Sequence, residues 1–264
     1  MRQKIIICLF GLIFSFLASQ KLQGEDIPSF GYVDLELFSA TLSEGNPMVS
    51  GIFIDWYPGS ALIHLGFSGS YGSASFLAFE GGIGIPLSAS FERNVPTSFI
   101  SNVWTTYTYN AKITHYEVSR TRADRIKLTV ADLGIKKVFD FYYYEGYPDE
   151  KELFGKTYSD MTEYEVYADD LIIYGGIKIM HLLNSALSLD EFVFYAHALL
   201  GIADRRANIW TVFNDPSYAP EEKGKLVPGF ETGIRYNMTL FRLGMYNNSF
   251  YFNAGFRIPF SVGF

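Results

Sequence analysis

Cysteine is almost absent from this chain of 264 residues, because the single one is Cys8, close to the N-terminus. We therefore expect neither a disulfide nor a thiol nucleophile or cysteine metal ligand in the rest of the chain. Charged residues are also few, at 19%, where globular domains average roughly 25%. The net charge of -7 argues against a nucleic-acid partner.

Long apolar runs are missing after residue 20, so no later segment is suited to a helical membrane span. The one long run, residues 5–18, follows Arg2 and Lys4 and is shorter than the roughly 20 residues that a transmembrane helix needs. A basic start, a short apolar run and a polar stretch are typical of a secretory signal. We predict a signal peptide over residues 1–24, cleaved after Gly24, and a single domain over residues 25–264; an uncleaved anchor is the alternative.

The chain is rich in aromatic residues, at 17%, and in apolar residues at every second position. In residues 48–57, for example, Ile52, Ile54 and Trp56 alternate with Gly51 and Asp55. This alternation predicts β-strands with one apolar face. Further predicted strands are 30–42, 61–67, 79–91, 103–118, 126–144, 171–183, 192–203, 230–241 and the C-terminal stretch. Many reach the roughly 9–11 residues with which a tilted strand crosses a bilayer.

A strand with one apolar face can bury that face in a soluble core or turn it to lipid in a membrane barrel. The opposite face here is rich in Gly, Ser, Thr, Asn and scattered charge, which favours a polar interior with lipid outside. We predict an all-β fold, an antiparallel transmembrane β-barrel with short turns plus longer loops. It has ten strands if 126–144 is one strand, and twelve if that segment divides near Gly134 and 209–213 adds a strand. An eight-stranded barrel is a further alternative.

The connection 145–170 holds nine acids against two lysines. The twelve-strand version places it outside the cell, as long loops usually are, whereas the ten-strand version leaves it periplasmic. We interpret it as a solvated loop or as a site for divalent cations, and the sequence assigns no metal ligands.

The chain ends on F-Y-F-N-A-G-F-R-I-P-F-S-V-G-F, a regular apolar stripe. The stretch resembles the closing strand of bacterial outer-membrane β-barrel proteins, of which OmpW-like and other small barrels are nearest in size; the resemblance does not separate an OmpW-like from a porin-like subfamily. The resemblance implies outer-membrane lipids and the barrel-assembly machinery as partners, and two termini that face the periplasm. It also implies that the assembly signal is carried by Ile258, Phe260, Val262 and Phe264.

Residues 79–91 repeat the C-terminal pattern, because F-E-G-G-I-G-I-P-L-S-A-S-F aligns without gaps to residues 252–264. Convergence under the same constraints and a true duplication are both compatible with this likeness. In either case we expect the two strands to run in the same direction. A strand proline removes a ladder donor, so Pro86 and Pro259 should each mark a bulge or kink near one rim.

Alternation also assigns charged side chains to the barrel interior. Because the first and last strands of a closed barrel pair, Asp34 and Glu36 are expected to meet Arg257. The network is either a set of ion pairs that fills a narrow lumen or a channel with charged walls, and small barrels have little free bore. The predicted interior network is Asp34, Glu36, Asp55, Glu80, Lys112, Lys178, Glu231, Arg235 and Arg257.

The first function expected is a narrow outer-membrane pore for passive passage of small solutes, reached through the secretory pathway. The second is a surface-exposed anchor or adhesin whose loops bind a partner. The third is a membrane-embedded lipid hydrolase, which needs a histidine beside a serine. His64 with Ser68, and His115 with Ser119, are four residues apart on one strand face, too far at about 3.3 Å per residue. We therefore predict no enzyme and no cofactor.

Overall fold

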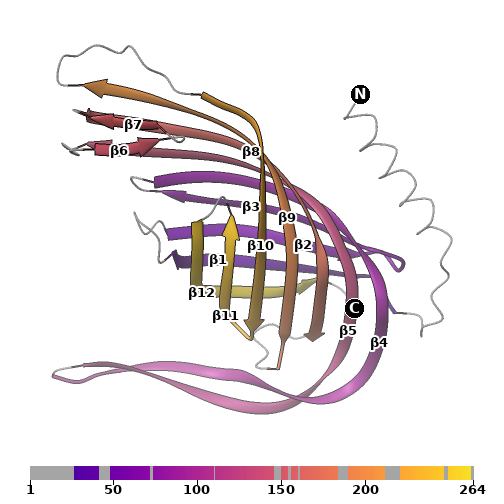
Figure 1. The fold of residues 1–264 in the computed structure, drawn as a ribbon. Helices are drawn as coiled ribbons and strands as arrows, with labels where there is room; N and C mark the ends of the chain where they lie inside the picture. The colour runs from indigo at the N-terminus through magenta and orange to yellow at the C-terminus, as the bar shows by residue number, and fades with distance from the viewer. Residues whose placement is uncertain are drawn as a thin grey trace.

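Figure 1 shows the computed structural model, in which β-strands curl into a barrel. The structure describes residues 27–41, 48–71, 74–109, 111–145, 150–153, 156–159, 161–183, 190–211, 221–246 and 249–262. Within these ranges no helix is long and apolar enough to cross a membrane. The predicted signal peptide and Phe264 lie outside the described residues.

Ten strands form one closed antiparallel sheet, in the order β1-β12-β11-β10-β9-β8-β5-β4-β3-β2. β1 closes the ring, because it pairs with β12 on one side and with β2 on the other. A separate hairpin, β6 (Glu150–Leu153) and β7 (Lys156–Ser159), lies between β5 and β8 in the chain. The barrel strands are β1 (Phe30–Thr41), β2 (Met48–Tyr57), β3 (Leu62–Tyr71), β4 (Ala74–Tyr107), β5 (Lys112–Glu145), β8 (Met161–Leu183), β9 (Phe192–Thr211), β10 (Glu221–Tyr236), β11 (Thr239–Tyr246) and β12 (Ser249–Val262).

The all-β, antiparallel fold predicted from the alternation is confirmed, but two of the predicted strands are wrong. Residues 103–118 contain a turn between Thr108 and Ala111 and are shared by β4 and β5. Residues 230–241 divide at Asn237, whose φ of 54° is the left-handed conformation that asparagine tolerates in tight hairpins. Residues 126–144, in contrast, belong to one strand, with no break at Gly134.

The two ends of the barrel define two rims. At the terminal rim β1 begins with Phe30 and β12 ends with Val262. At the distal rim β1 ends with Thr41 and β5 ends with Glu145. The connection from β5 to β8, which contains the β6–β7 hairpin, therefore begins and ends at the distal rim (Figure 1).

β4 and β5 continue past the terminal rim as a two-stranded arm, residues 87–124 (Figure 1). Pairing between β3 and β4 ends at Gly84, and pairing between β5 and β8 begins at Arg125. The described strands of the arm therefore pair only with each other. Register shifts between Pro86 and Ser88, and again before Val95, mark bulges that bend the paired strands.

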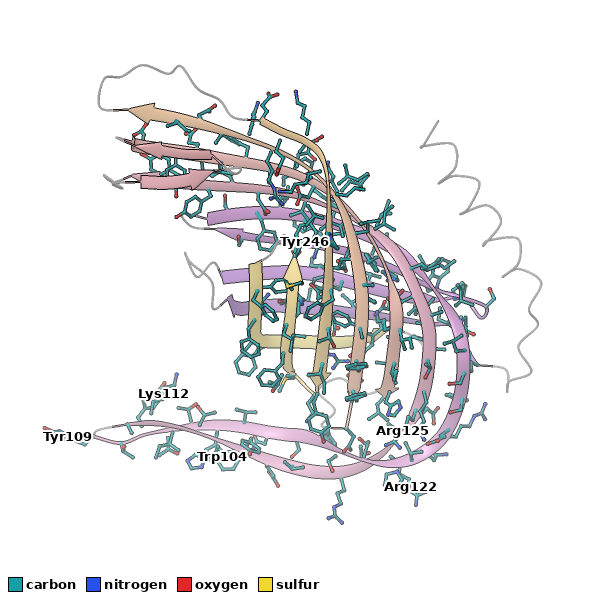
Figure 2. The ribbon with its side chains drawn as sticks, in the orientation of Figure 1. Trp104, Tyr109, Lys112, Arg122, Arg125 and Tyr246 are labelled. Carbon is teal, nitrogen blue, oxygen red and sulfur yellow. The ribbon has the colours of Figure 1, made fainter. Side chains whose placement is uncertain are left out.

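Aromatic and basic side chains project from the arm, and Figure 2 labels several of them. Trp104 is 46% exposed and Tyr107 is 75% exposed. Lys112 lies beside the Tyr107 ring at the tip and is exposed, so its predicted place in the interior is wrong. The alternation misplaced it because it continued the barrel's inward face into a segment that has left the barrel.

The echo between residues 79–91 and 252–264 has the predicted direction. Four antiparallel steps around the ring separate β4 from β12, so the two strands run the same way. Pro86 borders a register shift, as predicted. Pro259 does not, because its pairing with Asp34 is continuous with both neighbours and the irregularity follows Glu36 on β1.

The outer wall of the barrel is apolar and exposed on every barrel strand from β2 to β12. On β2, Ile54 is 40% exposed and Trp56 is 52% exposed, while Asp55 between them is 7% exposed. Strand alternation therefore places the charge inside and the apolar side chains outside, the reverse of a soluble barrel.

Candidate functional site

The barrel interior is tightly packed at its terminal end. Apolar side chains from β1, β3, β5, β8 and β9 meet there, and Leu62, Val130 and Met180 are each 0% exposed. Apolar residues therefore fill the bore at this end. We call this cluster the apolar plug; its buried members are Phe30, Tyr32, Tyr57, Leu62, Ile126, Leu128, Val130, Met180, Leu182 and Val193.

A buried ion-pair network adjoins the apolar plug. Glu191, which precedes β9, accepts hydrogen bonds from the Tyr32 hydroxyl at 2.7 Å and the Leu183 N–H at 3.1 Å. Its Oε2 also lies 3.2 Å from the Arg235 guanidinium, which reaches Asp34 at 3.6 Å. Both Glu191 and Arg235 are at most 2% exposed, so the connection between β8 and β9 is tied into the closed end.

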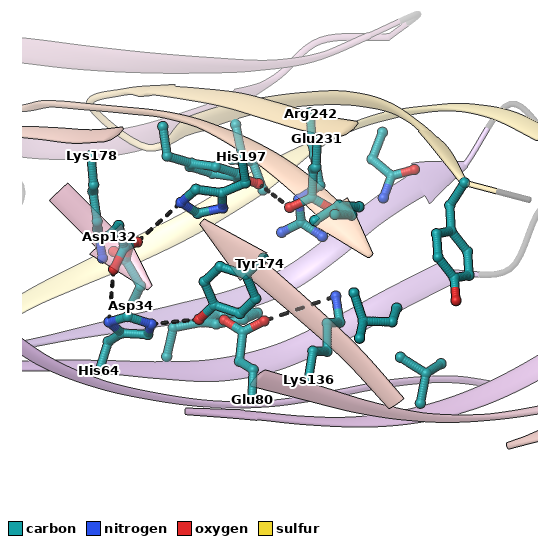
Figure 3. A pocket seen from close by; sticks show the side chains of 18 of the residues that line it. Asp34, His64, Glu80, Asp132, Lys136, Tyr174, Lys178, His197, Glu231 and Arg242 are labelled. Atoms are coloured by element: carbon teal, nitrogen blue, oxygen red, sulfur yellow. Dashed lines mark hydrogen bonds and ion pairs between the residues drawn. The ribbon is translucent and has the colours of Figure 1, made fainter. Parts of the chain in front are cut away.

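Beyond the plug, toward the distal rim, a cavity of about 390 Å³ occupies the interior (Figure 3). Its wall comes from strands of both halves of the chain and is strongly charged. Seven acids face it, Asp34, Asp55, Glu80, Asp132, Asp140, Asp170 and Glu231, with four bases, Lys136, Lys178, Arg235 and Arg242, and two histidines, His64 and His197.

Asp132 of β5 lies between His64 and His197 in this wall (Figure 3). One carboxylate oxygen, Oδ2, lies 3.0 Å from Nε2 of His197, and the other, Oδ1, lies 3.4 Å from Nδ1 of His64. The Nε2 atom of His64 contacts the Tyr174 hydroxyl at 2.5 Å. Asp132 itself is 2% exposed, so four strands hold one deeply buried carboxylate between two imidazole rings.

Other charged side chains of the barrel interior also form ion pairs. Lys178 is 2.6 Å from Asp55, and the Arg242 guanidinium is 3.1 Å from Glu36. Glu231 has no ion-pair partner among the described residues, but it accepts hydrogen bonds from two phenols, at 2.9 Å from Tyr195 and 2.6 Å from Tyr251. Most of the interior charge is thereby hydrogen-bonded, as buried charge requires.

Glycines on neighbouring strands make room for the large interior rings. A Cβ atom on Gly82 would collide with the His64 imidazole, and one on Gly134 would collide with the Tyr174 ring. Gly82 and Gly134 are direct partners across β4 and β5, so the two rings lie over one gap in the side-chain wall. Tyr195 over Gly233, Tyr246 over Gly201 and Tyr251 over Gly244 repeat the arrangement.

Seven of the predicted interior residues lie inside the barrel, namely Asp34, Glu36, Asp55, Glu80, Lys178, Glu231 and Arg235. Glu36 pairs in register with Arg257, but the Arg257 side chain lies outside the described part of the chain. In the C-terminal stripe, Ile258, Phe260 and Val262 pair with Leu35, Val33 and Gly31 on β1. Their role in barrel assembly stays a prediction.

Asp132, Lys136 and Arg242 were not predicted from the sequence. Along β5 the inward residues are apolar up to Val130 and mostly polar from Asp132, with Val138 as the exception, so the apolar stripe changes face within one strand. If the apolar residues of β5 are assumed to stay on one face, the inward residues beyond Val130 are assigned to the wrong side. The interior glycines that face tyrosine or histidine rings are a further sign of which residues point inward.

No family model matches this chain, and no curated protein matches it either. Among the described residues, no group of three or more histidine or acidic side chains is arranged to hold a metal ion. The cavity is distinguished by its charged wall, several of whose side chains are buried.

Proposed function

We propose that this chain is a transmembrane β-barrel of the bacterial outer membrane. Support comes from the outer wall, where twenty-two large apolar side chains outside the arm are more than about 37% exposed. Burying one such side chain is worth roughly 1.5–3 kcal/mol, and monomeric soluble proteins seldom expose contiguous apolar patches beyond a few hundred Å². Lipid covers such a wall, and a closed sheet leaves no unpaired edge in it.

We infer that the barrel is an anchor whose cavity is open at the distal rim and closed at the other end, which we call a blind cavity. The observation that supports this inference is the apolar plug. The charged cavity extends from the plug to Asp140, which is exposed. A second cavity at the distal rim shares Phe76 and Asp140 with it, which continues the path outward. With both termini in the periplasm, as the resemblance of β12 implies, the cavity opens at the cell surface beside the β6–β7 hairpin.

The narrow pore expected from the sequence is the alternative, and it requires the plug to move. We expect the purified barrel to insert into planar bilayers without a defined conductance step. Faster migration unheated than boiled on a detergent gel checks that the inserted protein is folded. A stable, salt-sensitive conductance from the folded wild-type barrel would refute the blind cavity and favour the pore.

Two neighbouring plug residues offer a matched pair of variants. Leu128 and Met180 are direct partners across β5 and β8 and are at most 1% exposed. Replacing both with alanine should open a leak through the bore. The adjacent partners Thr129 and Ile179 have outward-facing side chains, so the same double replacement there should leave the barrel silent.

A further inference from the structure

We propose that the blind cavity binds a small organic ammonium ion, with Asp132 as its buried counter-charge. The inference rests on the proposed closed barrel and names the ligand class of that cavity. It begins from a charge imbalance, because seven acids and four bases line the wall, an excess of three negative charges with neutral histidines.

The excess of negative charge remains when the ion-pair partners of the wall residues are counted as well. Glu36 and Glu191 are paired with Arg242 and Arg235 of the wall, and Arg205 is paired with Asp170. These partners add two acids and one base. Uncompensated charge in a water-poor interior is costly, so a cation in the cavity would stabilise the wall.

One carboxylate oxygen shows where the imbalance lies. Asp132 is 2% exposed and lines the cavity, and its Oδ1 atom has no hydrogen-bond partner among the described residues. The nearest nitrogen recorded for the Asp132 atom is His64 Nδ1, at 3.4 Å and without hydrogen-bond geometry. A buried carboxylate normally accepts several hydrogen bonds, and an ammonium group supplies N–H donors with a positive charge.

Acidic residues also lie at the cavity's mouth. Asp140 is exposed and shared by both cavities, and Asp170 faces inward on β8 next to Asp140 on β5. Asp132 and Asp140 are eight residues apart on one face of β5, which corresponds to about 26 Å of strand. The acids therefore lead from an open mouth to a deep carboxylate, an arrangement that attracts cations inward.

The size and the aromatic lining favour an organic cation over a bare ion. A volume of about 390 Å³ is within the roughly 300–1,000 Å³ of small-molecule sites. Four phenol rings, those of Tyr174, Tyr195, Tyr246 and Tyr251, line the same chamber. Aromatic rings and carboxylates together suit an alkylammonium group, which carries a compact positive charge at the end of an apolar chain.

The test uses the full folded barrel in detergent micelles and three probes of one size, butylammonium, butanol and butyrate. Isothermal titration calorimetry should detect butylammonium and neither of the other two. Asp132→Asn keeps the shape of the side chain and removes its charge, and should weaken butylammonium binding at least about tenfold. Glu117→Gln is the control, because Glu117 is exposed on the arm and lines neither cavity; its binding should equal wild type.

Each result has a separate meaning. Binding of butanol or butyrate as strong as that of butylammonium, or unchanged binding in Asp132→Asn, would overturn the cation site. Folding of each variant is checked by heat-dependent gel migration, so lost binding in a folded Asp132→Asn barrel supports the site. A conductance step in the wild-type barrel would refute the blind cavity alone, because butylammonium binding at Asp132 is measured without it.

Discussion

Arg235 should be one of the most costly charges to remove from this barrel. It is 2% exposed. Its guanidinium forms ion pairs with Glu191 at 3.2 Å and Asp34 at 3.6 Å, and it donates a hydrogen bond to the Asn237 carbonyl oxygen at 2.7 Å. Arg235→Met keeps most of the volume and removes the charge. Breaking a buried pair costs about 3–5 kcal/mol. We expect the lower end, about 3 kcal/mol, because Glu191 keeps its bonds from Tyr32 and Leu183.

The assay is urea unfolding in lipid vesicles, followed by tryptophan fluorescence. Lys223→Met is the matched control, because Lys223 and Glu221 form an ion pair at the distal rim with side-chain exposures of 74% and 50%. Exposed pairs contribute about 0–1 kcal/mol, so this variant should unfold nearly as wild type does. Adding Glu191→Gln to Arg235→Met should recover part of the loss. Equal stabilities of Arg235→Met and Lys223→Met would refute the buried network as a stabilising element.

Two further predictions concern Gly82, which makes room for the His64 ring, and the two-stranded arm. Gly82→Ala should destabilise the barrel by about 1–3 kcal/mol, because the new methyl group would collide with His64 and the Leu133 carbonyl oxygen. Gly81→Ala should be neutral, since a Cβ there lies 3.4 Å from Leu65, and equal urea midpoints for the two variants would contradict this packing. Trypsin should cleave the folded protein first in the arm, after Lys112, Arg120 or Arg122, which are exposed. The two strands of the arm pair only with each other, which makes them easier to open than the barrel strands. The fragments should stay together on an unheated gel, and mass spectrometry that located the first cuts within the barrel would show the arm to be protected.

The sequence predicts the class of fold well because the alternation of Ile52, Ile54 and Trp56 with Asp55 has a single physical cause. A strand whose faces meet two different environments must alternate, whichever strand it pairs with. The pairing of β12 with β1 also follows from closure. What alternation does not show is a tight turn without glycine or proline, such as the one at Asn237, because a two-residue turn scarcely interrupts the period.

The site was predictable only in part, for a related reason. Asp34, Asp55 and Glu80 stand within regular stripes, so their inward direction could be read from the sequence. Asp132 could not, because the inner face of β5 changes from the apolar plug to the charged cavity at that residue. Which acid meets which base also depends on register across the ring, and register is a property of the closed sheet rather than of any one strand.

The same hidden turns decide at which end of the barrel each connection lies. Taking 103–118 as one strand adds a crossing before residue 126, and taking 230–241 as one strand removes a crossing later. The two errors cancel in the total of strands but invert the sidedness of everything between them. The structure places the turns at 108–111 and at Asn237, so the acidic connection after Glu145 moves to the distal rim. Asp140, the cavity mouth and that connection then share one end of the barrel, and the apolar plug, the start of β1 and the end of β12 share the other. In the proposed blind barrel a solute reaches the charged cavity from the acidic side, which is why the charge of the ligand is the first property to test.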